Sequence, residues 1–206
     1  MTGQILLRDA LLIDPEAGTE TRGDLLVEDD RIASIHPGGG GDAGAAKSAT
    51  VIDCAGRALA PGIVDMSVYV GEPGARHRES YRTAGLAAAA GGVTTMVVRP
   101  DTDPVADDPA VLEFALRRAA AVCPVNVRLM GALTQGCAGK RMSEMGFLKD
   151  AGAAAFTDGD HPVADPTVFR RALTYAKSLD ALVIHHPQEP VLSAQGCATE
   201  SFFAAK

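Results

Sequence analysis

The hydrophobic and polar positions change their pattern near residue 60. Before that point, short apolar runs alternate with turn residues, as in 5–13, 24–28 and 31–35. The last two runs are separated by Asp29-Asp30, a two-residue polar turn typical of a β-hairpin. The first 60 residues are therefore predicted to form a small β-sheet module without helices.

From residue 61 onward, apolar β-branched runs alternate with longer segments of helical character, which is the pattern of a parallel α/β sheet. The predicted strands cover residues 63–70, 93–98, 125–130, 153–157 and 181–186. The predicted helices cover residues 79–90, 108–122, 143–151 and 166–178. This amounts to about half of a (β/α)8 barrel, which typically needs ~250 residues. An open five-stranded sheet is the alternative that the pattern leaves open.

Composition narrows the class of protein. The chain has 206 residues, 47% of them hydrophobic, and a net charge of −7, which argues against nucleic-acid binding by simple electrostatics. It contains no run of about 18 apolar residues, and its N-terminus does not resemble a secretory signal. Four cysteines without a Cys-x-x-Cys pair are expected to be free, mostly buried thiols: Cys54, Cys123, Cys137 and Cys197. We therefore expect a cytoplasmic protein that binds neither membrane nor nucleic acid.

The segment from Pro61 to Gly74 carries the most specific motif. It resembles the signature that opens the catalytic barrel of dihydroorotases and related cyclic amidohydrolases, Pro-Gly-x-x-Asp-x-His-x-His-x-Arg-x-Pro-Gly. Its framework positions are kept: Pro61, Gly62, Asp65, Glu72, Pro73 and Gly74. The family's two metal-binding histidines and its substrate-binding arginine correspond to Ser67, Tyr69 and Gly71.

These replacements have a direct chemical consequence. Residues two apart on a strand point to the same face, so a His-x-His pair aims two imidazoles at one metal ion. Imidazole is a good zinc ligand, whereas Ser67 offers a neutral hydroxyl and Tyr69 a bulky phenol. Both are expected to be ordinary strand residues rather than ligands.

Four later segments extend the resemblance over the whole chain. Residues 90–95 match Gly-Gly-Val-Thr-Thr, and residues 99–104 resemble Met-Pro-Asn-Thr-x-Pro. Residues 155–160 resemble Ala-Phe-Ser-Asp-Asp-Gly, and residues 185–190 resemble a His-Ala-Glu-Asp-Pro run. The resemblance implies an α/β fold class, with a partial β-sandwich module at 1–60 and the N-terminal half of a β/α barrel, about five strands, at 61–206.

Two residues match metal ligands that the resemblance implies. Asp158 corresponds to a carboxylate that can bridge two metals, although the order Asp158-Gly159-Asp160 leaves Asp160 as a rival. His186 corresponds to one of the ligand histidines. One carboxylate and one histidine are too few for a catalytic zinc site. No cofactor is expected on this interpretation, and zinc is expected if the site is functional.

The substrate-binding positions have changed as well. The family's arginine and asparagine correspond to Gly71 and Asp101, so a bidentate cation is lost and a like charge is placed opposite the substrate carboxylate. Arg99 lies two residues from Asp101 and is a candidate counter-ion, with a surface or core-edge arginine as the ordinary interpretation. His77 and His161 are interpreted as solvated loop histidines. No catalytic or substrate-binding residue is assigned.

The resemblance implies a degenerate, truncated dihydroorotase-like protein of pyrimidine biosynthesis that is non-catalytic. Degenerate family members assemble with aspartate transcarbamoylase, so that enzyme or a second copy of the chain is the expected partner. The family's remaining ligand and its general base lie on strands six to eight, beyond Lys206, and we expect a truncation or a longer gene product. One alternative is an active metal-dependent dihydroorotase completed by a partner chain. Another is an unrelated open-sheet α/β binding module.

Overall fold

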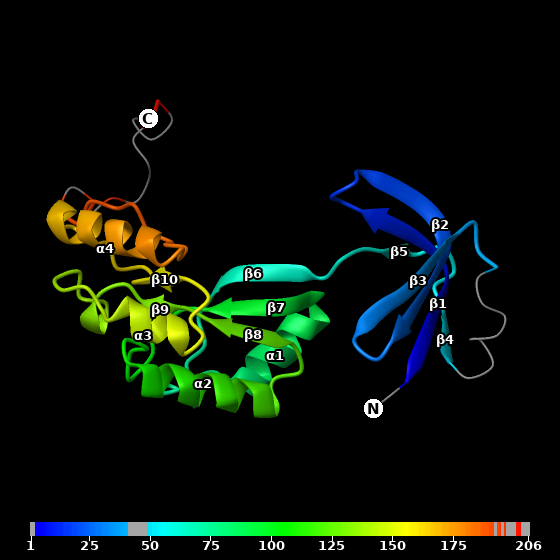
Figure 1. The fold of residues 1–206 in the computed structure, drawn as a ribbon, viewed down its shortest axis with the longest axis horizontal. Helices are drawn as coiled ribbons and strands as arrows, with labels where there is room; N and C mark the ends of the chain where they lie inside the picture. The colour runs from blue at the N-terminus through cyan, green and yellow to red at the C-terminus, as the bar shows by residue number, and fades with distance from the viewer. Residues whose placement is uncertain (1–2, 41–48, 192, 195, 197–200, 203–206) are drawn as a thin grey trace. The chain divides into compact units, whose positions relative to one another are not determined.

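The computed structural model of the chain describes residues 3–40, 49–191, 193–194, 196 and 201–202. It divides into two compact units, Met1–Pro61 and Gly62–Lys206 (Figure 1). Cys197, for which the sequence predicts a free thiol, lies outside the described residues. None of the helices in the described part of the chain is long and apolar enough to cross a membrane.

The described residues of the first unit form a five-stranded sheet. Its strands are β1 (Gln4–Asp14), β2 (Thr19–Glu28), β3 (Arg31–Pro37), β4 (Thr50–Asp53) and β5 (Ala58–Leu59). The strand order is β3-β2-β1-β4, and β5 also pairs with β1. Strands β1, β2 and β3 are antiparallel neighbours, whereas β4 and β5 run parallel to β1. The predicted hairpin is confirmed, because Glu28 pairs with Arg31 across the Asp29-Asp30 turn.

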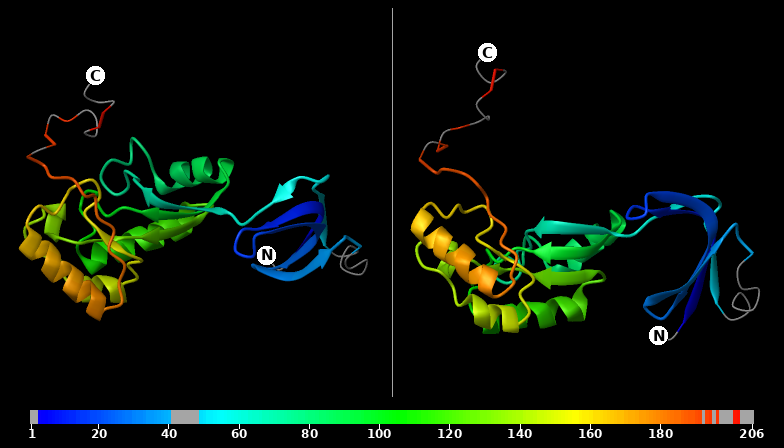
Figure 2. Two further views of the ribbon diagram at one scale, coloured as in Figure 1. Left: turned by 90° about the horizontal axis from the view of Figure 1, so that it is seen from above. Right: turned by 45° about the horizontal axis from the view of Figure 1, so that its top comes forward.

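The second unit contains consecutive parallel strands. They are β6 (Ile63–Val68), β7 (Val93–Val98), β8 (Asn126–Leu129), β9 (Gly131–Ala132) and β10 (Phe156–Thr157). Strands β6, β7 and β8 lie side by side in that order (Figure 2), and β9 pairs with β10. Only Met130 separates β8 from β9, and its N–H donates to the carbonyl of Val98 at 2.9 Å. The two small sheets therefore continue one another.

The predicted fifth strand at 181–186 is reduced to one parallel bridge between Phe156 and Val183. Two backbone hydrogen bonds flank it, from Phe156 to Leu182 and from Ile184 to Phe156, each of 2.9 Å. Within the described residues no strand pairs with its other side. It thus has hydrogen-bond partners on one edge only, which limits its regular length.

Among the described residues, four α-helices connect and cover these strands: α1 (Tyr81–Ala90), α2 (Pro109–Val122), α3 (Met145–Asp150) and α4 (Pro166–Ser178). The sequence signals their starts. Asp108 and Asp165 accept hydrogen bonds from the first-turn amides of α2 and α4, each just before a proline. Ser80 and Thr83 form a capping box at α1. A 3-10 helix, η2 (Gln135–Cys137), was not predicted, because three residues leave no periodic pattern.

Side-chain alternation divides the second unit into two apolar clusters. Met96 and Val98 of β7 join a large core with residues of α2 and α4, such as Leu112 and Ala172. Val97 points to the opposite face of the sheet, as expected for the residue between them. There it packs with Met130 between β8 and β9, with Ala155 just before β10, and with Ile184 at the fifth strand position. The helices thus cover one face of the sheet and a smaller apolar cluster lies on the other, so the expected α/β fold class is confirmed.

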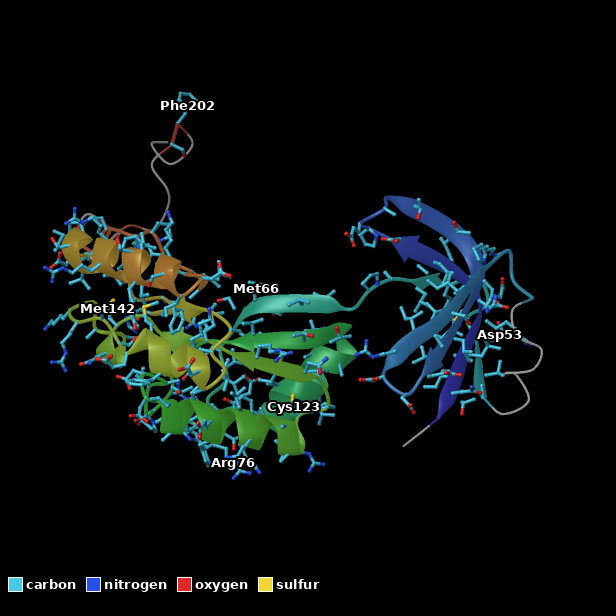
Figure 3. The ribbon with its side chains drawn as sticks, viewed as in Figure 1. Asp53, Met66, Arg76, Cys123, Met142 and Phe202 are labelled. Carbon is cyan, nitrogen blue, oxygen red and sulfur yellow. The ribbon has the colours of Figure 1, made fainter. Side chains whose placement is uncertain are left out.

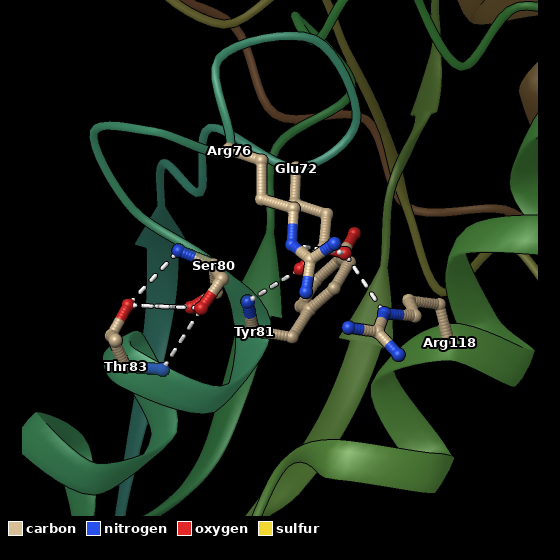
Figure 4. A network of polar contacts seen from close by, with 6 residues as sticks. All are labelled: Glu72, Arg76, Ser80, Tyr81, Thr83 and Arg118. Atoms are coloured by element: carbon tan, nitrogen blue, oxygen red, sulfur yellow. Dashed lines mark hydrogen bonds and ion pairs between the residues drawn. The ribbon is translucent and has the colours of Figure 1, made fainter.

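A buried carboxylate joins the loop after β6 to two helices (Figure 4). Glu72 is only 5% exposed. It accepts a hydrogen bond from the backbone N–H of Tyr81 at 3.1 Å and another from Arg118 Nε at 2.9 Å. Arg76 lies at 3.6 Å and is exposed. Burial and the nearby Glu72 charge raise the pKa of the Tyr81 phenol. Glu72 therefore fixes the start of α1 against α2.

Replacing Glu72 by alanine is expected to lower the free energy of unfolding by about 2–3 kcal/mol, because it leaves the Arg118 charge and the Tyr81 N–H without their partner. Urea denaturation followed by circular dichroism measures this. The matched variant Arg76→Ala removes only the exposed partner and should cost about 0.5 kcal/mol or less. Equal losses in the two variants would contradict the role assigned to Glu72.

Candidate functional site

A small cavity lies at the carboxyl ends of the parallel strands, the edge where β/α barrels carry their active sites. Its volume is about 110 Å³. The residues that line it lie in β6, between β8 and β9, in and just after β10, and at the fifth strand position: Ser67, Met130, Thr157, Gly159, Asp160, Ile184, His185 and His186. The polar ones among them make this edge the candidate site.

An arginine at the end of β7 holds a cluster of charges at the same edge. Arg99 donates two hydrogen bonds to Asp101, from Nη2 at 2.6 Å and from Nε at 3.1 Å. Its Nη1 lies 2.8 Å from a carboxylate oxygen of Asp160. Its guanidinium carbon lies 5.7 Å from the centre of the Tyr69 ring, which is within cation–π range. The candidate counter-ion Arg99 is thus paired with Asp101.

Burial differs within this cluster. The side chains of Arg99 and Asp101 are each 14% exposed, whereas that of Asp160 is 71% exposed. The hydrogen bonds to Asp101 are the main cause that raises the pKa of Arg99, and burial opposes them. The bidentate pair with Asp101 is therefore the dominant interaction, since exposed ion pairs contribute little.

Asp158 is held away from the cavity by Thr134. Only 3% of Asp158 is exposed. One of its carboxylate oxygens accepts the Thr134 N–H at 2.8 Å, and the other accepts the Thr134 hydroxyl. Burial raises the pKa of Asp158, while hydrogen bonds from Thr134 and Leu133 act in the opposite direction. Sequence reasoning missed Thr134, because no local signal links residues 24 positions apart.

The two adjacent histidines differ in environment. His186 is exposed, and its Nε2 lies 2.9 Å from the side-chain oxygen of Gln188. His185 is half-buried with its ring 4.4 Å from that of Phe169, and burial lowers its pKa. No group of three or more histidine, cysteine, aspartate or glutamate side chains within the described residues is arranged to hold a metal ion. Metal binding by Asp158 and His186 stays a prediction.

The position that corresponds to the family's substrate-binding arginine is closed. A Cβ atom on the buried Gly71 would lie 2.7 Å from the backbone oxygen of Ala75. A side chain at this position would therefore force the loop after β6 to open. His77 and His161 are exposed, as expected of loop histidines.

Comparison with known proteins identifies the family. The sequence profile described as dihydro-orotase-like matches residues 56–206. The chain belongs to the dihydroorotase-like family. Dihydroorotases of Geotalea daltonii and Anaplasma phagocytophilum are 39% and 41% identical to it over 98% and 93% of its length. The chain covers 47% and 43% of these two relatives, so it spans about half the length of the curated relatives it matches.

Solved structures show the same fold as this dihydroorotase-like chain. An L-hydantoinase from Arthrobacter aurescens aligns with a TM-score of 0.78 at 21% identity, over 94% of this chain and 43% of its own. An N-acyl-D-glutamate deacylase from Bordetella bronchiseptica, complexed with zinc and a phosphonate inhibitor, aligns with a TM-score of 0.56 at 19% identity. The alignment covers 89% of this chain and 44% of the deacylase. Family membership leaves no place for the alternative of an unrelated open-sheet module.

Gly159 brings the loop after β10 close to the charge cluster. It has a positive φ of 65°, and an added Cβ would lie 3.0 Å from the carboxylate carbon of Asp101. Gly159→Ala is expected to lower the free energy of unfolding by about 2–3 kcal/mol, through backbone strain and this contact. Gly136 has a φ of 62° with nothing within 4 Å of an added Cβ. Gly136→Ala should therefore lower the free energy of unfolding by only about 1 kcal/mol. A loss at Gly159 no larger than that at Gly136 would contradict the close approach of Gly159 to Asp101.

Cys137, in η2, is expected to be the slowest of the described thiols to react. It is 6% exposed. Burial, assisted by the Asp158 charge, raises the pKa of its thiol to about 12. Because the thiolate is the reacting species, iodoacetamide at neutral pH should modify the half-buried Cys54 before Cys137. Peptide mass spectrometry of the folded protein measures both rates, and equal rates would contradict this expectation.

Proposed function

We propose that this chain is a non-catalytic dihydroorotase-like protein of pyrimidine biosynthesis that acts by assembling with another protein. Membership of the family supports the pathway, since the relatives are named dihydroorotases. The observation that carries the loss of catalysis is the charge cluster at the strand ends. There, an arginine paired with two aspartates stands among residues that offer few metal donors.

The chemistry of the family explains why the donor set matters. Opening a cyclic amide at neutral pH needs an activated water, and a metal ion supplies it by lowering the pKa of that water. The positions that resemble the first two ligands are Ser67 and Tyr69, and neutral hydroxyls are poor zinc ligands. Both oxygens of Asp158 are bound by Thr134. The residues present therefore do not fit a catalytic zinc centre.

A purified chain is expected to show no hydrolysis of dihydroorotate and no cyclisation of carbamoyl-aspartate, with or without added zinc. Product formation followed by chromatography measures both directions, and metal analysis should find less than one zinc ion per chain. The dihydroorotase of Geotalea daltonii, assayed in parallel, is the positive control. Zinc-dependent turnover that His186→Ala abolishes would contradict the proposal.

That contrary result would favour the alternative of an active dihydroorotase completed by a partner chain. One observation favours this alternative: His185, His186 and Asp160 line the same cavity. Within the described residues, however, no three such side chains are arranged to hold one metal ion, so a partner would have to supply further ligands.

Assembly is supported by the edge strand β6. Its apolar side chains Ile63, Val64 and Met66 are 56%, 52% and 47% exposed, and Figure 3 marks Met66 on this strand. Exposed apolar strand edges favour pairing with another chain. We propose aspartate transcarbamoylase, or a second copy of the chain, as the partner.

Size-exclusion chromatography with light scattering, with and without aspartate transcarbamoylase from the same organism, tests the assembly. Met66→Lys places a charge on the edge strand and should weaken the complex at least tenfold. Phe114→Lys, at an exposed aromatic side chain of α2, is the matched control. A monomer under both conditions would contradict an assembly role.

A further inference from the structure

Two departures from the family motif lie beside each other and compensate in charge. Where the resembling motif has methionine and asparagine, this chain has Arg99 and Asp101. Either charge alone would be costly at 14% exposure, because a largely buried charge needs a partner. Together they form a bidentate pair, with contacts of 2.6 and 3.1 Å. The two replacements therefore act as one unit.

We propose that the Arg99 guanidinium is the resident cation of the strand-end site, where it ties together three loops in the place of a metal ion. Tyr69 contributes its ring from the loop after β6. Asp101 contributes a carboxylate from the loop after β7, and Asp160 contributes one from the loop after β10. The proposal rests on the proposed function, but its test measures stability rather than turnover.

The chain is shaped to bring these groups together. Gly159 lets the loop after β10 approach the Asp101 carboxylate closely, which places Asp160 next to Arg99 Nη1. A guanidinium stays protonated at all pH values at which the protein folds, so its charge is permanent. A divalent cation close to Asp101 and Asp160 would be repelled by this charge. Arg99 thus fills the electrostatic role of a metal and excludes one.

The two ion pairs of Arg99 differ in strength. The pair with Asp101 is bidentate and mostly buried, whereas Asp160 is 71% exposed and screened by solvent. Removal of Arg99 leaves the buried Asp101 charge beside Asp160 with no cation between them. Removal of the Asp101 charge leaves Arg99 with Asp160 as its partner. The arginine is therefore the more sensitive half of the pair.

The test is a double-mutant cycle on thermal unfolding of the full chain, with Arg99→Met, Asp101→Asn and the double variant that restores both family residues. We expect Arg99→Met to lower the unfolding midpoint by roughly 5 °C, and Asp101→Asn to lower it less. The double variant should unfold at a higher temperature than Arg99→Met, because the uncompensated carboxylate is gone. Additive losses would overturn the proposal.

A second measurement tests the exchange of guanidinium for metal. Millimolar Ca²⁺, a cation that suits carboxylate ligands, should raise the unfolding midpoint of Arg99→Met and leave the wild-type midpoint unchanged. Arg117→Met removes the same charge from an exposed position of α2 and should show neither the loss nor the Ca²⁺ response. A Ca²⁺ response in wild type equal to that of Arg99→Met would overturn the proposal.

If Arg99→Met does not fold, Arg99→Lys replaces it. Lysine keeps the charge but loses the bidentate geometry, so a smaller loss of the midpoint and no Ca²⁺ response are expected. An unfolding midpoint of Arg99→Lys equal to that of the wild type would overturn the proposed role of the Arg99 guanidinium. Turnover of dihydroorotate by the wild-type chain would contradict the proposed function. The unfolding midpoints of the variants would still test the role of Arg99.

Discussion

The buried carboxylate of Glu72 is the interaction on which the site-bearing end of the second unit depends. It lies in the loop that leaves β6 and binds both the first amide of α1 and the guanidinium of Arg118 on α2. A charge at 5% exposure is stable only while these partners are in place. The loop is thereby fixed, and its tight path closes the side-chain space at Gly71.

The fixed loop sets the environment of the strand ends. Tyr69, at the start of this loop, places its ring against Arg99. Arg99 in turn forms an ion pair with Asp160 in the loop after β10. On the proposal above, the strand ends are held together by a permanent organic cation, the guanidinium of Arg99. This explains physically how the framework of the family motif persists while its ligand positions carry residues of other chemistry.

Much of the second unit could be predicted from sequence because its elements carry local signals. The strand at 93–98 and the helix at 166–178 were predicted with the bounds that β7 and α4 have. Asp165 followed by Pro166 specifies the start of α4 by capping and by a preset φ, both of which are local effects. The fifth strand was overestimated and β9 was missed. The extent of both depends on pairing with neighbours rather than on their own residues.

The candidate site divides in the same way. The sequence by itself indicated the family, placed Ser67 and Tyr69 where the resemblance implies ligand histidines, and showed the charge pattern at Arg99 and Asp101, because these are identities at fixed spacings along one strand or turn. Only the tertiary structure decided that Asp158 turns to Thr134 and that Asp160 joins Arg99. Those contacts link residues 24 or more positions apart, and the packing of parallel strands, not local sequence, brings such residues together.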